Sequence, residues 1–128
     1  MTEEQYSWRV HDTCPSAIKI LDTEDLHCLR YAREDAFNQN LEFDEESLLK
    51  SESSLREISS ILRCDLSIMI SEHEVELLKN TFKVPESIIH YLPFLLKQSP
   101  KPSKLNYEER QDFMSIGNFL HKPNWDSV

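Results

Sequence analysis

Three side chains that can bind or deprotonate a hydroxyl group are clustered between residues 22 and 27. Asp22, Asp25 and His27 lie at or just beyond the end of a short apolar run at residues 17–21. If that run is a strand in a parallel sheet, its carboxyl end is where open α/β sheets place their ligands. A carboxylate or imidazole there could orient a hydroxyl group or accept its proton. The alternative is that Asp22 and Asp25 stabilise the start of a helix and that His27 packs or is solvated.

A second group of candidate binding residues lies near the end of the sequence. Gly117 is the only glycine of the chain and is followed by Asn118. Glycine permits a backbone path that brings amide groups close to a diphosphate, and His121 or Lys122 could add positive charge to that contact. An ordinary turn with a solvated lysine explains the same residues equally well.

The elements that must position these residues are predicted from apolar spacing. Residues 17–21, 66–70 and 87–92 read as buried strands, and helical patterns lie between them. Alternation of strands and helices favours a parallel sheet with crossover helices, so the three strands should be neighbours in one sheet. A fourth strand is predicted at residues 113–116, after a polar, proline-containing linker at residues 97–111. The predicted fold class is α/β.

Local signals also predict where the helices begin. Thr23 can cap the second helix, and Ser54 and Ser71 each start a Ser-x-x-Glu capping box. The box at Ser54 indicates that residues 44–63 form two helices rather than one. Leu48, Leu55, Ile58 and Leu62 share the predicted apolar face of that stretch.

Composition argues against several classes of function. The formal charge of −9, from 23 acidic and 14 basic residues, repels phosphate backbones, so no nucleic-acid partner is expected. The three cysteines form no CxxC pair, His73-Glu74 does not continue as H-E-x-x-H, and no metal site is predicted. No stretch approaches a membrane span and the start lacks a signal peptide, so we expect a cytoplasmic chain without an integral membrane segment.

The last nineteen residues, RQDFMSIGNFLHKPNWDSV, resemble the opening of the C-terminal domain of group 1 glycosyltransferases. The family pattern there is F-x-G-N-F-x-H-x-P-N-x-D-A-V, and Gly117, Asn118 and His121 fit it. Two earlier segments also resemble the family, in the right order. They are the turn ILDTEDLH at residues 20–27 and the strand and helix start RCDLSIMISE at residues 63–72.

The resemblance implies a GT-B architecture, in which two Rossmann-like domains of three layers face each other across a cleft. Residues 1–96 would be the later part of the acceptor-side domain, residues 97–111 the interdomain linker, and residues 112–128 the truncated start of the donor-side domain. Asp22, Asp25 and His27 would then be catalytic candidates, and Gly117, Asn118 and His121 donor-binding candidates.

The predicted function follows from that resemblance. The chain would be a fragment of an enzyme that transfers a sugar from a nucleotide-sugar donor to an acceptor hydroxyl, inactive alone because most of the donor site is missing. The nucleotide sugar is a substrate, and no separate cofactor is expected. The alternative is an acidic module without catalytic activity that binds a protein partner.

Overall fold

The structure is a computed structural model that describes residues 2–95, 106–118, 120 and 124. The chain divides into two units, Met1–Leu95 and Leu96–Val128. The first unit contains all the strands that the structure describes and the three catalytic candidates Asp22, Asp25 and His27.

The first unit is built on a parallel three-stranded sheet. Strands β1 (Ile20–Asp22), β2 (Leu66–Met69) and β3 (Ile89–Tyr91) lie in the order β1-β2-β3. Leu21 pairs with Ser67, and Ser67 pairs with Ile89. The prediction of three parallel neighbouring strands is confirmed. Their bounds differ, because β1 begins three residues later than predicted and a 3-10 turn, η1 (Glu86–Ile88), takes up the predicted start of β3.

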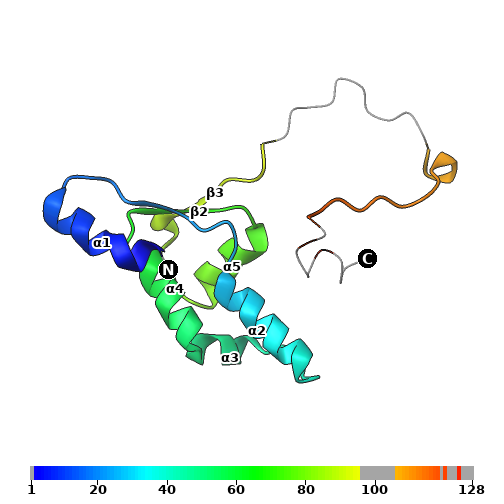
Figure 1. The fold of residues 1–128 in the computed structure, drawn as a ribbon, viewed down its shortest axis with the longest axis horizontal. Helices are drawn as coiled ribbons and strands as arrows, with labels where there is room; N and C mark the ends of the chain where they lie inside the picture. The colour runs from blue at the N-terminus through cyan, green and yellow to red at the C-terminus, as the bar shows by residue number, and fades with distance from the viewer. Residues whose placement is uncertain (1, 96–105, 119, 121–123, 125–128) are drawn as a thin grey trace. The chain divides into compact units, whose positions relative to one another are not determined.

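In the described residues, five helices lie on one side of this sheet and form one layer (Figure 1). They are α1 (Thr2–Thr13), α2 (His27–Asn38), α3 (Glu45–Lys50), α4 (Glu52–Leu62) and α5 (Glu72–Asn80). Strands added in one direction by right-handed crossovers keep their connecting helices on the same face of the sheet. The described residues therefore show two layers, where three were predicted. No helix in these ranges is long and apolar enough to cross a membrane.

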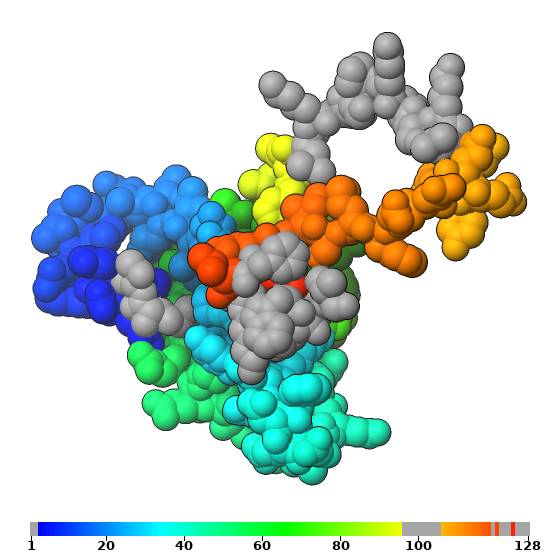
Figure 2. All heavy atoms as spheres, turned by 45° about the vertical axis from the view of Figure 1, so that its right-hand side comes forward, coloured from blue at the N-terminus to red at the C-terminus, as the bar shows by residue number. Residues whose placement is uncertain are grey.

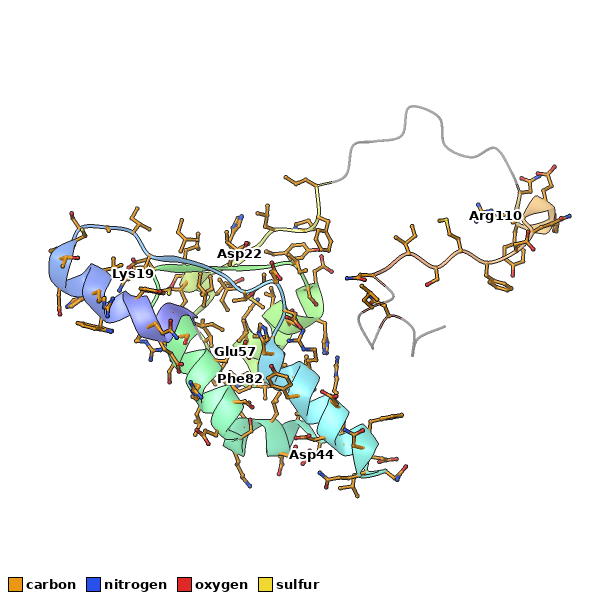
Figure 3. All side chains as sticks on the ribbon, viewed as in Figure 1. Lys19, Asp22, Asp44, Glu57, Phe82 and Arg110 are labelled. Atoms are coloured by element: carbon orange, nitrogen blue, oxygen red, sulfur yellow. The ribbon has the colours of Figure 1, made fainter. Side chains whose placement is uncertain are left out.

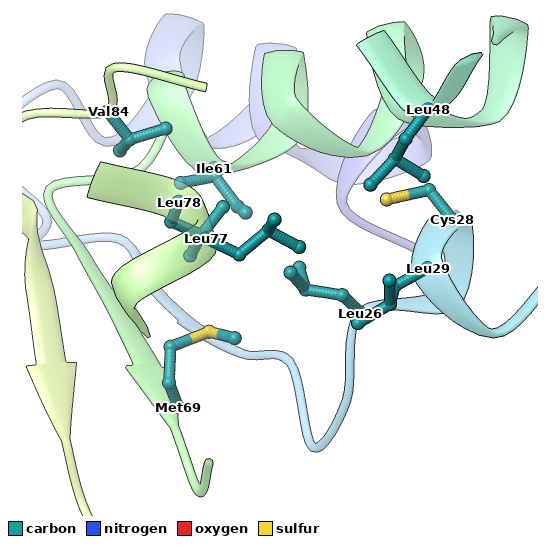
Figure 4. Packing of buried hydrophobic residues seen from close by; sticks show 9 residues of the cluster. All are labelled: Leu26, Cys28, Leu29, Leu48, Ile61, Met69, Leu77, Leu78 and Val84. Carbon is teal, nitrogen blue, oxygen red and sulfur yellow. The ribbon is translucent and has the colours of Figure 1, made fainter. Parts of the chain in front are cut away.

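The hydrophobic core lies between the helical layer and the inner face of the sheet. Met69 of β2 is fully buried, whereas Ile20, which points to the opposite face from β1, is 58% exposed. Figure 4 shows the core side chains converging from β2, α2, α3, α4 and α5. The cluster consists of Leu26, Cys28, Leu29, Leu48, Ile61, Met69, Leu77, Leu78 and Val84.

Residues 44–63 form two helices as predicted, but the break and the buried face differ from the prediction. The break lies at Ser51, whose hydroxyl accepts a hydrogen bond from the Ser54 amide at 3.1 Å, so Ser51 rather than Ser54 is the cap. Leu55 and Leu62 are 60% and 54% exposed, while Ile61 is fully buried. The extended backbone of Ser51 interrupts the helical repeat, so the periodicity of α3 cannot be carried into α4.

The described part of the second unit contains one short element, the 3-10 turn η2 (Tyr107–Glu109). Asn106 and Glu109 close a capping box around this turn. The strand predicted at residues 113–116 is wrong. Phe113 is fully solvent-exposed, Ile116 is 84% exposed, and no described residue pairs with this segment. An apolar run becomes a strand only where a neighbouring strand accepts and donates its backbone hydrogen bonds.

Candidate functional site

A cavity of about 390 Å³ lies at the carboxyl end of β1, among the first turns of α1, α2 and α4. Two of the three predicted catalytic residues, Asp22 and His27, line it. Figure 3 labels Asp22 at the end of β1 and Glu57 on α4. The full lining is Glu3, Leu21, Asp22, Thr23, His27, Cys28, Tyr31, Ser53, Arg56 and Glu57.

Thr23 shapes this end of the cavity, but it does not cap α2, so that prediction is wrong. Its buried hydroxyl donates to the carbonyl of Ile68 at 2.8 Å, which ties the end of β1 to β2. Glu24 then adopts a left-handed backbone with φ of 57°. This turn delays the start of α2 to His27, so Glu24 and Asp25 precede the helix rather than occupying its first turn.

The amino end of α2 is closed by two buried glutamates from other helices. The Glu57 carboxylate of α4 accepts hydrogen bonds from the His27 amide at 3.1 Å and the Cys28 amide at 2.7 Å. Glu74 of α5 accepts one from the Leu26 amide at 3.0 Å. Amides at a helix start lack partners within the helix and attract negative charge. Glu57 and Glu74 supply this negative charge, and they lie 29 to 48 residues away in sequence from the amides that they accept from.

His27 is the side chain of this site best placed to exchange a proton with a ligand. Its ring lines the cavity and its side chain is 44% exposed. On the other side, Nδ1 lies 3.2 Å from Oε1 of Glu57 and 3.9 Å from Oδ1 of Asp25. A histidine oriented by a carboxylate through one ring nitrogen and open to a ligand is a common arrangement for general acid–base chemistry.

The two predicted aspartates have different surroundings. Asp22 ends β1, is exposed and lines the cavity. The Asp25 carboxylate is ion-paired with Arg30 at 2.9 Å and is not among the residues that line the cavity. Asp22 and His27 therefore line one cavity, whereas Asp25 is not part of its lining and lies next to His27.

Burial changes the proton affinity of two further groups near His27. Burial raises the pKa of Glu74, whose Oε2 atom has no hydrogen-bond partner among the described residues. Burial and the neighbouring Glu57 raise the pKa of the Cys28 thiol to about 12, so the thiol stays protonated and does not act as a nucleophile at neutral pH. All three cysteines of the chain are free.

Ion pairs hold α1 against α4 at the rim of the cavity. In the space-filling view of Figure 2, blue atoms of the N-terminal helix lie beside green atoms of the helical layer. Arg63 binds Glu3 with two hydrogen bonds of 3.0 and 2.6 Å, and Arg56 binds Glu4 with two of 3.1 and 2.7 Å. These arginines hold the pKa of Glu3 and of Glu4 at about 2. Although Glu3 and Arg56 line the cavity, each is engaged by a partner of opposite charge.

The predicted donor-binding residues fall in the second unit. Gly117 does not adopt the left-handed backbone. The absence of a side chain at Gly117 leaves room for Asn124, since a Cβ atom at Gly117 would lie 3.0 Å from Cγ and Nδ2 of Asn124. The Asn118 carboxamide accepts a hydrogen bond from the Leu120 amide at 3.1 Å, and its carbonyl accepts one from Asn124 at 3.0 Å. His121 lies outside the described residues.

Sequence reasoning did not find Glu57 as a site residue. The signal was present in the Ser54-to-Glu57 spacing, but it was interpreted as a local capping box rather than as a contact with α2. Across the described ranges, no group of three or more His, Cys, Asp or Glu side chains is arranged to hold a metal ion. Comparison with known protein families, curated proteins and solved structures found no match to this chain.

Proposed function

We propose that this chain carries the acceptor side of a sugar transfer from a nucleotide-sugar donor. The single observation behind this proposal is the cavity at the carboxyl end of β1, which Asp22 and His27 both line and in which a buried carboxylate lies 3.2 Å from the imidazole. The resemblance of residues 20–27, 63–72 and 110–128 to group 1 glycosyltransferases supports the same function. The proposal includes a GT-B architecture for the whole enzyme.

In the proposed reaction, an acceptor hydroxyl in the cavity attacks the anomeric carbon of the donor sugar. The new bond joins the acceptor oxygen to that carbon, and the bond from the carbon to the diphosphate oxygen breaks. His27 takes the hydroxyl proton, and Asp22 orients the acceptor through a hydrogen bond. The diphosphate leaves with the bonding electrons. Gly117, Asn118 and His121 remain the donor-binding candidates that the family resemblance implies.

The cavity has a suitable size and chemistry for such an acceptor. Its volume of about 390 Å³ falls in the range of small-molecule sites, which is roughly 300–1,000 Å³. Tyr31 and Leu21 contribute apolar surface, while Ser53, Asp22 and His27 contribute polar groups. A sugar presents both kinds of surface, since its hydroxyl groups form hydrogen bonds and its C–H faces pack on apolar side chains.

A saccharide-binding screen with matched variants tests this proposal. Ligand-observed NMR would measure binding of a panel of methyl glycosides, disaccharides and polyols to the full chain. We expect at least one ligand with millimolar affinity, lost in His27→Ala and weakened in Asp22→Asn. The controls are His11→Ala and Asp12→Asn, both at exposed positions of α1 away from the cavity. Binding that survives in His27→Ala, or no binding by any member of the panel, would contradict the proposal.

A protein-binding role without catalysis is the second candidate. The observation that favours it is the outer face of the sheet, where Ile18 and Ile20 are 77% and 58% exposed. Parallel sheets are usually covered on both faces, so such a face is suited to a partner. This role predicts that the screen described above finds no saccharide ligand.

A further inference from the structure

Glu57 lines the cavity and also contacts the start of α2 and the His27 ring. Its side chain is 3% exposed, yet its carboxylate lies within hydrogen-bond distance of three nitrogen atoms, all from the start of α2. They are the His27 amide, the Cys28 amide and the His27 ring nitrogen Nδ1. A buried carboxylate shared among these donors constrains both the helix terminus and the imidazole.

The first constraint concerns the tautomer of His27. A neutral imidazole carries one proton, and the nitrogen facing a carboxylate is the one that holds it. Nδ1 faces Glu57 at 3.2 Å and Asp25 at 3.9 Å, whereas no described residue forms a hydrogen bond with Nε2. The lone pair of the neutral ring is therefore on Nε2, where a ligand hydroxyl can donate to it.

The second constraint concerns the charge of the ligand. The start of a helix of this length attracts phosphate and other anions through its free amides. In this chain Glu57 occupies the amides of His27 and Cys28, and Glu74 occupies that of Leu26. The side of the cavity formed by α2 therefore presents a carboxylate to the ligand instead of bare amides, and an anion would meet repulsion there.

We infer that Glu57 is the positioning and specificity-determining residue of this site. It holds His27 with the proton on Nδ1, and it fills the amino end of α2. The cavity consequently selects an uncharged hydroxyl ligand and rejects phosphorylated ones. This inference rests on the proposed function for the identity of the ligand class, but the tautomer and the anion exclusion are properties of the free protein.

Imidazole nitrogen NMR tests the tautomer without any sugar ligand. Long-range proton–nitrogen spectra of the full chain would be recorded at the alkaline plateau of the His27 titration. We expect a pyrrole-type Nδ1 and a pyridine-type Nε2 in the wild type, and a shift of both signals toward a tautomer mixture in Glu57→Gln. The control is Glu52→Gln, an exposed carboxylate on the same helix, which should leave the tautomer unchanged. A protonated Nε2 in the wild type, or an unchanged tautomer in Glu57→Gln, would overturn the inference.

Inorganic phosphate tests the anion exclusion through a gain of binding. In Glu57→Ala the amides of His27 and Cys28 are left without an acceptor, so phosphate should produce saturable shifts of these two signals and raise the melting temperature. Wild type and Glu34→Ala, measured in parallel, should show neither site-specific shift and only the general effect of the salt. Phosphate binding at these amides in the wild type would refute the exclusion, as would no binding in a folded Glu57→Ala chain. If Glu57→Ala does not fold, the inference is tested by phosphate titration of Glu57→Gln together with the His27 tautomer of the wild type. Failure of the saccharide screen alone would instead count against the proposed function.

Discussion

Replacing Glu57 with alanine should destabilise the first unit more than any surface substitution on the same helices. The variant leaves the Cys28 and His27 amides without acceptors in a buried setting. Each hydrogen bond to a charged acceptor contributes about 1.5 kcal/mol. The loss of one buried methylene group adds about 0.8 kcal/mol, and removal of the carboxylate from its buried site offsets part of the total. We expect a net loss of about 3 kcal/mol in the free energy of unfolding.

Urea denaturation followed by circular dichroism measures this loss. For a unit of this size, about 3 kcal/mol corresponds to a fall in melting temperature of roughly 15 °C. Glu57→Gln retains one carbonyl acceptor but places an NH2 group near an amide, so it should lose about 1 to 2 kcal/mol. Glu34→Ala removes an exposed glutamate from α2 and should stay within about 0.5 kcal/mol of wild type. A Glu57→Ala chain as stable as Glu34→Ala would refute the role of Glu57 as the cap of α2.

Three further predictions test the surroundings of the site. Because burial raises the folded-state pKa of Glu74, its neutral form contributes stability below the unfolded value near 4.5, and this contribution is lost as the pH rises through the folded pKa. Glu74→Gln should therefore raise the melting temperature at pH 7 relative to wild type and have little effect at pH 4. A gain that is equal at both pH values would show that ionisation of Glu74 is not the cause. Ile61→Ala should lower the free energy of unfolding by about 2 to 4 kcal/mol, and Leu62→Ala by less than about 1 kcal/mol. Equal losses for the two variants in urea denaturation would contradict the assignment of Ile61 to the buried face of α4. Iodoacetamide at pH 8 should modify exposed Cys14 in the native chain and leave Cys28 unmodified until unfolding, as mass spectrometry of tryptic peptides would report. Equal rates at the two cysteines would contradict the burial of the Cys28 thiol.

The parallel sheet could be predicted because its signals are local. Short apolar runs separated by helical patterns require crossover connections, and crossovers make neighbouring strands parallel. The placement of Asp22 and His27 followed from the same reasoning, since residues after a parallel strand gather at its carboxyl edge. These two residues needed only the position of β1 to be located.

The capping pattern could be predicted only in part, because sequence spacing does not say which helix a glutamate will cap. Both Ser-x-x-Glu segments were expected to close on themselves. Ser71 caps α5 as predicted. However, Ser51 rather than Ser54 caps α4, and the side chains of Glu57 and Glu74 reach across to α2. A buried carboxylate binds the amides that tertiary packing places beside it, and these amides can be far from it in the sequence.

The predicted strand at residues 113–116 failed for a related reason. Its apolar composition is suitable for a strand, but a strand also needs a neighbour with free backbone groups, and periodicity does not reveal one. The three-layer arrangement was likewise inferred from the family resemblance, whereas the outer face of the described sheet leaves Ile20 exposed.

The nitrogen spectrum of His27 during a saccharide titration tests the central claim most directly. The claim is that a ligand hydroxyl binds at Nε2 of His27 in the cavity beside β1. Addition of the best ligand from the screen should shift the Nε2 resonance of His27 saturably, with the same dissociation constant as the ligand signals, and should leave His11 and His90 unchanged. Saturable binding of the ligand with no change at Nε2 of His27 would contradict the claim.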